Sequence, residues 1–304
     1  MEPREGADVG RNTARLMAIV DALARVADQG ARLADIMRAT GLNKTTVHRL
    51  LAGLAAHGLA DHDAETGRFF VGMRLLSLAE AAKRRFRLAA LVEPVLVRLS
   101  AQTQDTLTLV VRSGDEAVCL DCREGSFPIK VLTLHAGDRR PLGIGAGSLA
   151  LLAFLPDAEI ERILVQHASA RAAFPFDDVQ LRQMIAAARK NGYAYNDVHV
   201  FTGMETITDM AAVGVPVLAT DGTPVAALHL TAITQRLEAP RRDNIVTVLR
   251  REARQIETSF APVLDAMRPP VGTGQVAGHV AGAASPAVAD AGRARSAVRR
   301  TRST

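Results

Sequence analysis

The sequence predicts an α+β protein built from two domains, a small helical one followed by a larger mixed α/β one. Three observations support this class. The chain has 304 residues, a length typical of two domains. Apolar residues recur at helical spacing as far as Gly58 and alternate at strand spacing from Thr106. Hydrophobic residues make up 48% and charged residues 23%, which is typical of a globular protein.

The first domain, residues 11–72, is predicted to contain three helices and a hairpin. Helices are expected at about 12–28, where Gly30 follows, at 33–40 before Gly41, and at 43–57 before Gly58. Short extended segments at 59–62 and 68–71 then flank a turn-rich centre, as in a β-hairpin. This order of elements is that of a winged helix-turn-helix.

The third helix has the two faces that a DNA-reading helix requires. Val47, Leu50, Leu51 and Leu54 share one apolar face by their spacing, and a polar face lies opposite. Asn43 suits the N-cap position, and Lys44 with two hydroxyls would meet phosphates there. The alternative is an ordinary surface helix pair, but the hairpin that follows favours DNA binding. The predicted DNA contacts are Asn43, Lys44, Thr45, Thr46, His48, Arg49 and, on the wing, Arg68.

The net positive charge of the chain does not lie in the predicted DNA-binding domain. The chain carries +5, but six arginines and one aspartate from Arg268 onward account for all of it. Residues 1–72 hold nine basic and nine acidic residues. DNA affinity must therefore come from placed contacts and from dimerisation on two-fold symmetric sites. The tail, residues 268–304, is predicted to be a disordered basic end, with an accessory polyanion-binding arm as the alternative.

Residues 73–103 look helical, with a linker helix over 73–90 and an interruption at Pro94. The second domain, residues 91–267, is predicted to mix strands and helices. Strands are expected at 106–112, 117–121, 129–134, 206–219 and 224–232, the last two joined by an Asp221-Gly222 turn. Helices are expected at 147–155, 157–168, 177–191 and 240–267.

Two segments of this domain are candidates for binding a small molecule. The glycines in the stretch 141–148 permit close backbone approach, and the helix that begins there favours an anion. The alternative is a tight strand-to-helix turn. His229 and Thr231 share one face of a later strand and would add polar groups for an organic acid, although a lone histidine on a strand is often structural.

Residues Arg11–Val71 resemble the DNA-binding domain of the IclR family of bacterial regulators, most closely in the phrase Thr40–Leu51 and in the wing Gly67–Gly72. The resemblance extends to about residue 265. It implies a linker helix, a GAF-like effector domain, and homodimers or homotetramers on palindromic double-stranded DNA. It also implies that Gly143, Ile144, Gly145, Ala146, Asp197, His229 and Thr231 contact the effector. Gly143 and Ile144 replace the family's usual His-Ala, and the stretch Asp197–Pro216 is longer than its usual pattern.

The remaining motifs suggest no catalysis. No nucleophile–base motif or complete P-loop occurs, so neither an enzyme nor a cofactor is expected. Cys119 and Cys122 are predicted to be buried and inert, on opposite faces of a strand; the alternative is a zinc site with His135, His199 or His229. No signal peptide or membrane span is recognised, which favours the cytoplasm.

We therefore expect a sequence-specific transcription regulator, more readily a repressor than an activator, that is controlled by a small carboxylate effector. The competing hypothesis is a small-molecule-binding enzyme or sensor in which the winged helix only mediates assembly.

Overall fold

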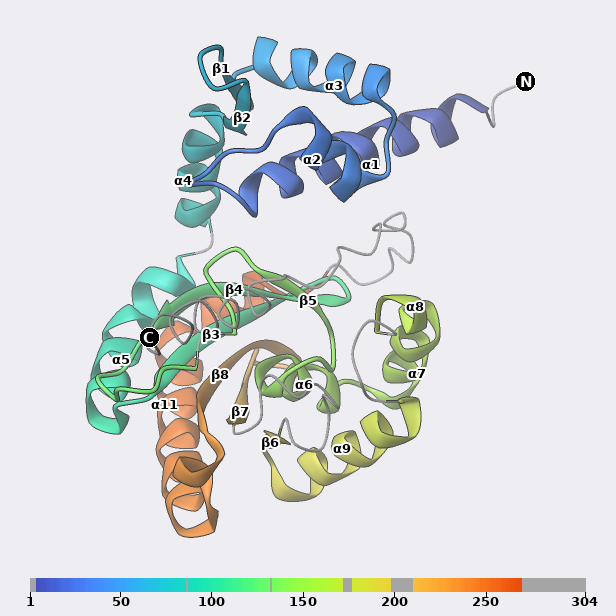
Figure 1. The fold of residues 1–304 in the computed structure, drawn as a ribbon. Coiled ribbons are helices and arrows are strands. Elements are labelled where there is room, and N and C mark those ends of the chain that lie inside the picture. The colour runs from blue at the N-terminus through green and yellow to red at the C-terminus, as the bar shows by residue number, and fades with distance from the viewer. Residues whose placement is uncertain (1–3, 86, 132, 172–176, 198–209, 270–304) are drawn as a thin grey trace, which may run out of the picture. The chain divides into compact units, whose positions relative to one another are not determined.

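The computed structural model describes residues 4–85, 87–131, 133–171, 177–197 and 210–269. The chain divides into two compact units, and the first ends at Arg85 (Figure 1). Each unit is described by itself.

The first unit has the predicted order of elements. Its helices are α1 (Arg4–Ala24), α2 (Leu33–Thr40), α3 (Lys44–Ala56) and α4 (Arg74–Arg85), and its hairpin consists of β1 (Ala60–Asp63) and β2 (Arg68–Val71). Helix α1 begins at Arg4 rather than near residue 12, so the predicted start of this helix was too late. No proline lies between Pro3 and Pro94, so no residue of this stretch lacks the backbone donor that an earlier helix start requires.

Apolar side chains from all three leading helices form the core of this unit. Ile19, Ile36, Val47, Leu51 and Leu54 are each at most 4% exposed and pack in one cluster. A third short strand segment completes the wing, because Ala31 and Phe69 exchange backbone hydrogen bonds of 2.9 and 2.8 Å. The hairpin is thus anchored to the loop between α1 and α2.

The predicted break at Pro94 is wrong. Helix α5 (Leu88–Thr103) runs through Pro94, and the helical segment is divided before Leu88 instead. Proline in a helix removes one backbone donor, and here the packing of Leu88, Val92, Leu96 and Leu99 keeps the helix continuous.

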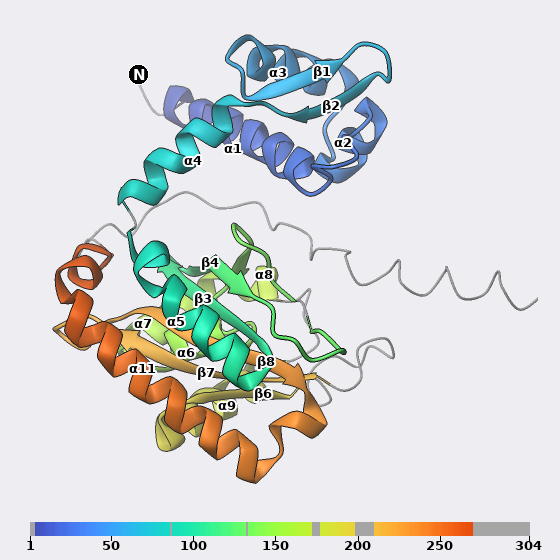
Figure 2. The ribbon, with the colours of Figure 1, turned by 90° about the vertical axis from the view of Figure 1, so that its left-hand side faces the viewer.

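A six-stranded antiparallel sheet forms the centre of the second unit (Figure 2). Its order is β5-β4-β3-β8-β7-β6. The strands, in chain order, are β3 (Thr106–Ser113), β4 (Glu116–Arg123), β5 (Arg139–Pro141), β6 (Ala194–Asp197), β7 (Met210–Leu218) and β8 (Pro224–Ile233). The Asp221-Gly222 hairpin is confirmed, with Gly222 at φ +83°.

Helices cover both faces of this sheet. Helix α5 and the long α11 (Ala239–Ala266) lie on one face and bury Leu107, Val213 and Leu228. Helix α6 (Ala146–Ala153), α7 (Asp157–Gln166) and α9 (Asp178–Asn191) lie on the other, which we call the α6 face. The short α8 (Ala168–Arg171) follows α7, and a 3₁₀ turn, η1 (Thr234–Leu237), precedes α11.

The strand predicted at 129–134 is wrong, because its described residues form no strand. The edge of β4 is already occupied: Gly137 and Asp138 exchange hydrogen bonds with Cys119, and β5 pairs with β4 from Arg139 onward. Arg268 was assigned to the tail, but its guanidinium lies 2.9 Å from Asp221 in the folded unit. Residues 270–304 of the predicted tail lie outside the described residues.

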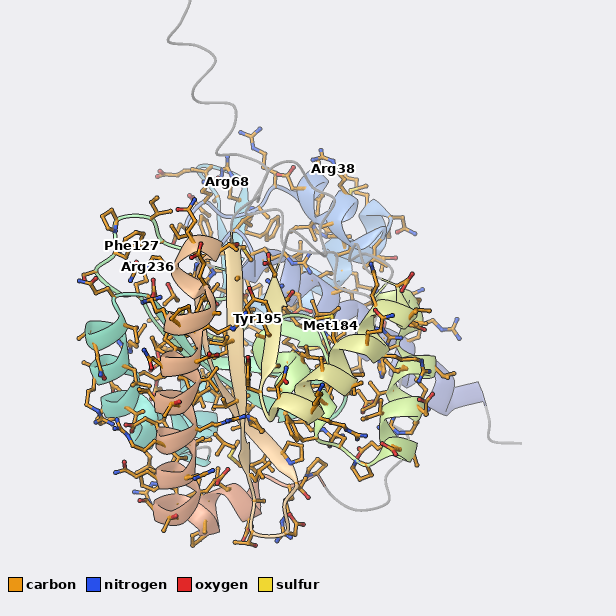
Figure 3. The ribbon with its side chains drawn as sticks, turned by 90° about the horizontal axis from the view of Figure 1, so that it is seen from below. Arg38, Arg68, Phe127, Met184, Tyr195 and Arg236 are labelled. Atoms are coloured by element: carbon orange, nitrogen blue, oxygen red, sulfur yellow. The ribbon has the colours of Figure 1, made fainter. Side chains whose placement is uncertain are left out.

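A buried carboxylate joins the start of β3 to the elements after β8. Asp105 is 4% exposed and pairs with Arg236 at 2.8 Å and with Arg241 at 2.5 Å. The Arg236 guanidinium also lies 3.9 Å from the centre of the Phe127 ring (Figure 3). This group, which we call the Asp105 cluster, fixes η1, α11 and the loop after β4 to one strand end.

Candidate DNA-binding and effector sites

Helix α3 presents the polar face that the sequence predicted. Val47, Leu50, Leu51 and Leu54 are buried. Lys44, Thr45, His48 and Arg49 are exposed, and Thr46 is half-buried. The Asn43 side chain accepts a 2.9 Å hydrogen bond from the Thr46 amide, which confirms the predicted N-cap. Ala52 and Gly53, further along the helix, carry little or no side chain, so the helix backbone there is open to close approach.

The wing arginine has a structural role that sequence reasoning missed. One nitrogen of the Arg68 guanidinium donates to the carbonyls of Gln29 and Gly30, at 3.0 and 2.9 Å. These partners are more than 35 positions away in the chain, so no local pattern indicated them. The wing tip itself carries Asp63 and Glu65, and Asp63 accepts hydrogen bonds from the Glu65 amide and the Thr66 hydroxyl.

A helix begins within the stretch 141–148, as the sequence suggested. It is α6, which starts at Ala146 and packs on the sheet. Gly143 and Gly145 both have positive φ, at +99° and +84°. The Ser148 hydroxyl accepts from the Gly143 amide and donates to the Pro141 carbonyl, closing the loop. Gly145 is at the N-cap, and no side chain of the described residues caps the first-turn amides of α6. Ile144 and Ala146 are buried.

His229 lies against this helix start. A Cβ added to Gly147 would come within 2.4 Å of His229 Nδ1, so only glycine leaves room for the ring. A Cβ on Gly214, in the neighbouring strand, would come within 2.5 Å of the Ala146 carbonyl oxygen. Because these two glycines have no side chains, the start of α6 packs directly against the ring of His229 and the backbone of β7.

The electrostatic state of His229 follows from its burial. The residue is 4% exposed, and its Nδ1 has no hydrogen-bond partner among the described residues. Burial, with a smaller contribution from the nearby Arg140 charge, lowers the pKa of His229 to about 4. The imidazole is therefore neutral at pH 7, where it can donate one hydrogen bond and accept another.

Strand register places further polar groups beside His229. On the α6 face, His229 pairs with Thr108 of β3, and Thr108 pairs with Cys122 of β4. The Thr108 hydroxyl lies 3.6 Å from Cys122 Sγ. Two residues further along β8, Thr231 lies between Thr106 of β3 and Ala212 of β7. We call these two lines of side chains the polar rows. Sequence reasoning found His229 and Thr231 but missed the β3 and β4 members, because only the register brings them together.

The prediction that the two cysteines face opposite ways is wrong. Cys119 pairs with Val110 and Cys122 with Thr108, two positions apart on β3, because Leu120 is an extra residue that bulges β4. Both side chains therefore lie on the α6 face and pack in its core. Burial raises the pKa of Cys119 to about 12 and raises that of Cys122, so both remain unreactive thiols.

Asp197 lies on the other face from the expected one. It pairs with Ala211, which belongs to the core under α11, and accepts a hydrogen bond from the Tyr195 hydroxyl at 3.3 Å. Its neighbour Asn196 pairs with Ala212 in the second polar row, and the Asn196 side-chain oxygen is buried without a partner in the described residues. The register thus puts an amide where a carboxylate was predicted. Leu228 and Leu230 belong to the core under α11, on the face of the sheet opposite His229.

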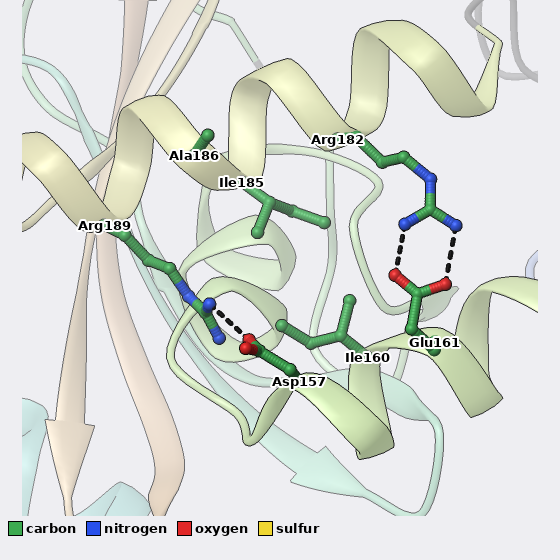
Figure 4. Close-up of a pocket in the computed structure, with 7 residues that line it drawn as sticks. All are labelled: Asp157, Ile160, Glu161, Arg182, Ile185, Ala186 and Arg189. Carbon is green, nitrogen blue, oxygen red and sulfur yellow. Dashed lines mark hydrogen bonds and ion pairs between the residues drawn. The ribbon is translucent and has the colours of Figure 1, made fainter.

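A groove of about 450 Å³ lies elsewhere, between α7 and α9 (Figure 4). Ile160 and Ile185 form its floor. Arg182 pairs with Glu161 and Arg189 pairs with Asp157 across it, as Figure 4 shows. All four charges are matched within the groove, so it offers no excess charge to an acid.

Other chemistry receives no support from the described part of the chain. There, no group of three or more histidine, cysteine or acidic residues is arranged to hold a metal ion, and His199 of the zinc alternative lies outside it. None of its helices combines the length and apolar character needed to cross a membrane.

Comparisons with known proteins assign the chain to a family. A model described as the IclR helix-turn-helix domain matches residues 13–64, and one described as the carboxy-terminal domain of bacterial IclR transcriptional regulators matches residues 80–258. The transcriptional regulator KipR of Bacillus subtilis is 27% identical over 226 residues, covering 74% of this chain and 87% of that protein.

Solved structures share the fold. An IclR transcriptional regulator from Alicyclobacillus acidocaldarius has a TM-score of 0.66 at 21% identity, covering 82% of this chain and 98% of that one. An IclR homologue from Microbacterium hydrocarbonoxydans, solved with 4-hydroxybenzoate, has a TM-score of 0.63 at 23% identity, covering 83% and 99%.

The matched proteins are named as regulators of transcription, in agreement with the expectation that the chain is not an enzyme. Helix α3, the wing and the sheet domain occur in the order of the two family models, which together span most of the chain. The chain belongs to the IclR family of bacterial transcriptional regulators and is a DNA-binding regulator.

Proposed function

We propose that the chain is a cytoplasmic repressor that binds a palindromic operator as a homodimer or homotetramer and responds to a small organic acid. The observation that carries the DNA-binding half is the exposed polar face of α3 above its buried apolar one. Repression is the simpler mode, because a bound oligomer blocks its operator without any further contact with the transcription machinery.

Each exposed side chain of α3 has a role suited to its chemistry. Arg49 projects from the middle of the polar face, where a guanidinium can pair with the edge of guanine. Lys44 and the hydroxyls of Thr45 and Thr46 lie at the helix start, where phosphates are bound. His48 lies beside Arg49. Asn43 contributes mainly by capping the helix, since its oxygen is engaged by Thr46.

Arg68 acts in this proposal by fixing the wing rather than by direct contact, because its guanidinium is already bonded to two carbonyls of the same unit. Residues 1–72, which hold α3 and the wing, have no net charge, and so a single copy would hold DNA weakly. Two copies on a two-fold symmetric site double the placed contacts, which supports an oligomer.

The acid is proposed to bind between the start of α6 and the polar rows. The first-turn amides of α6 favour an anion, and His229 with Thr231 offers uncharged polar groups beside them. Leu142 and Ile144 supply apolar surface. The structural relative that holds 4-hydroxybenzoate supports this class of ligand. The acid must bind one arrangement of the oligomer more tightly than another to change DNA affinity.

A gel-shift assay against the DNA upstream of the chain's own gene tests the DNA half. Arg49→Ala should weaken binding to the operator by about 1–3 kcal/mol without lowering thermal stability. Lys44→Ala should weaken binding to all DNA sequences alike. It should also reduce the slope of log affinity against log salt concentration by about 1, as expected for the loss of one phosphate contact. Arg38→Ala is the matched control, since Arg38 is an exposed arginine on α2 that pairs with Asp35. Unchanged affinity in Arg49→Ala would contradict the assignment of α3.

Thermal shift of the full chain with a panel of carboxylic acids tests the effector half. An acid that stabilises the protein should also weaken operator binding. Its affinity should fall in His229→Ala and in Gly145→Val, which changes a backbone position at φ +84°. An acid whose affinity survives both substitutions binds elsewhere.

A further inference from the structure

Two successive arginines on β5 have opposite environments. Arg139 is exposed, and its guanidinium pairs with Glu116 at 2.7 Å. Arg140 is half-buried and pairs in the sheet with Ala117, whose side chain belongs to the core of the α6 face. Arg140 donates a hydrogen bond of 2.5 Å to the Thr133 carbonyl, and no carboxylate of the described residues lies within ion-pair distance of it. Arg139 is thus paired with a carboxylate, and Arg140 is paired with none among the described residues.

The unmatched guanidinium lies beside the candidate effector site. Arg140 immediately precedes the loop 141–145 that leads into α6, and the Ser148 hydroxyl ties that loop back to Pro141. Arg140 pairs with Ala117 on the face of the sheet that also carries His229, and its charge contributes to lowering the pKa of His229. Burial lowers the pKa of Arg140 itself, and the charge of Asp138 opposes this shift. Asp138 is engaged by the His135 amide at 2.8 Å.

An unpaired cation in a poorly solvated place is costly, and the cost is recovered when an anion joins it. A guanidinium also offers two parallel donors that match the two oxygens of a carboxylate. The amides at the start of α6, which follows β5 and the loop 141–145, also favour negative charge. His229 is neutral and adds no charge of its own, so the acid group needs a separate cation.

We propose that Arg140 provides the countercharge for the acid group of the effector, a role that rests on the proposed effector site. The ligand is then a carboxylate whose acid group lies between Arg140 and the start of α6. Its remaining polar group, if it has one, lies toward His229 and Thr231 of the polar rows. A neutral analogue of the same shape, such as the primary amide, fits the same space but leaves Arg140 unpaired.

The test compares acids with their amides on two variants of the full chain. The probes are acetate, butyrate, benzoate and 4-hydroxybenzoate, each beside its primary amide, with affinity measured by titration calorimetry. Arg140→Gln removes the unmatched charge, and Arg139→Gln is its control on the same strand. Arg140→Lys, a second variant, keeps the charge but loses the paired donors. Urea unfolding of each variant establishes that it folds.

The expected result is an acid that binds the unaltered chain and Arg139→Gln equally, and Arg140→Gln about 30-fold more weakly. That change corresponds to about 2 kcal/mol at about 1.4 kcal/mol per tenfold. The preference for acid over amide should also disappear in Arg140→Gln, and Arg140→Lys should fall between. If Arg140→Gln does not fold, the loss in Arg140→Lys decides.

Two other results would overturn the proposal in different ways. An acid that binds Arg140→Gln as tightly as the unaltered chain, yet binds His229→Ala more weakly, would remove Arg140 from the site and leave the proposed function intact. Failure of all four acids to bind the unaltered chain at millimolar concentration would count against the organic-acid effector itself, and against this role of Arg140 with it.

Discussion

Lowering the pH from about 7.5 to 5.0 should destabilise the sheet unit through His229 by about 2 kcal/mol. The pKa of this buried imidazole is lowered from 6.5 to about 4. The unfolded chain therefore takes up a proton as the pH falls below 6.5, and the folded chain does so only near 4. The stability that His229 contributes is complete above pH 6.5 and is lost as the pH falls toward 4.

Two aspartates with lowered pKa values act in a lower pH range, whereas Glu257, whose pKa burial raises from 4.5, contributes alike to the unaltered chain and to the His229 variants. The pKa of Asp115 is lowered from 3.8, chiefly by its hydrogen bond from Arg162. That of Asp221 is lowered to about 2, chiefly by Arg268. Their contributions are present above pH 3.8 and are lost only below it.

Tyrosine fluorescence during urea unfolding measures this change in the right unit. The chain has no tryptophan, and both tyrosines, Tyr193 and Tyr195, lie in the sheet unit. The control variants His229→Asn and His229→Gln cannot titrate in this range, so each should lose about 2 kcal/mol less than the unaltered chain between the two pH values. Equal losses in all three proteins would refute a buried, neutral His229.

Two further substitutions and one measurement test separate parts of the molecule. Arg68→Ala removes the hydrogen bonds to Gln29 and Gly30, and should cost the amino-terminal unit about 1–3 kcal/mol in thermal unfolding; an unchanged melting temperature would contradict this. Asp105→Ala leaves two arginines without their carboxylate, and should lower the unfolding free energy of the sheet unit by about 3–5 kcal/mol in urea, so a negligible loss would argue against the Asp105 cluster. Light scattering at micromolar concentration should find dimers or tetramers, and a monomer that also binds DNA as a monomer would exclude the proposed oligomer.

The amino-terminal unit was predictable because its pattern is local. The apolar residues of α3 recur every three or four positions, so Val47 and Leu54 could be assigned to the core and Arg49 to the surface from spacing alone. The N-cap role of Asn43 depends on a residue only three positions away. The hydrogen bonds of Arg68 could not be predicted, because its partners lie in a distant loop and an exposed arginine and a bonded one have the same sequence pattern.

The sheet unit was predictable in its elements but less so in its site. Alternation places His229 and Thr231 on one face, but it does not say which residues of other strands lie beside them. Thr108 joins His229 only through the register between β3 and β8. Asp197 and Asn196 differ by one position, and that one position decides the face of the sheet. Arg140 lies on the edge strand β5, in a stretch where the sequence predicted no strand.

Because of the bulge at Leu120, β4 contains one residue more than the segment of β3 that pairs with it. Two thiols separated by three positions in the chain are therefore two places apart on the sheet, as in an even spacing. Deleting Leu120 should leave Cys119 and Cys122 on the α6 face, since only the surplus residue is removed. Deleting Val118 instead would force the strand to slip past β3 or turn Ala117 away from the face where Arg140 lies. The position of an insertion or deletion in this strand thus matters more than its length.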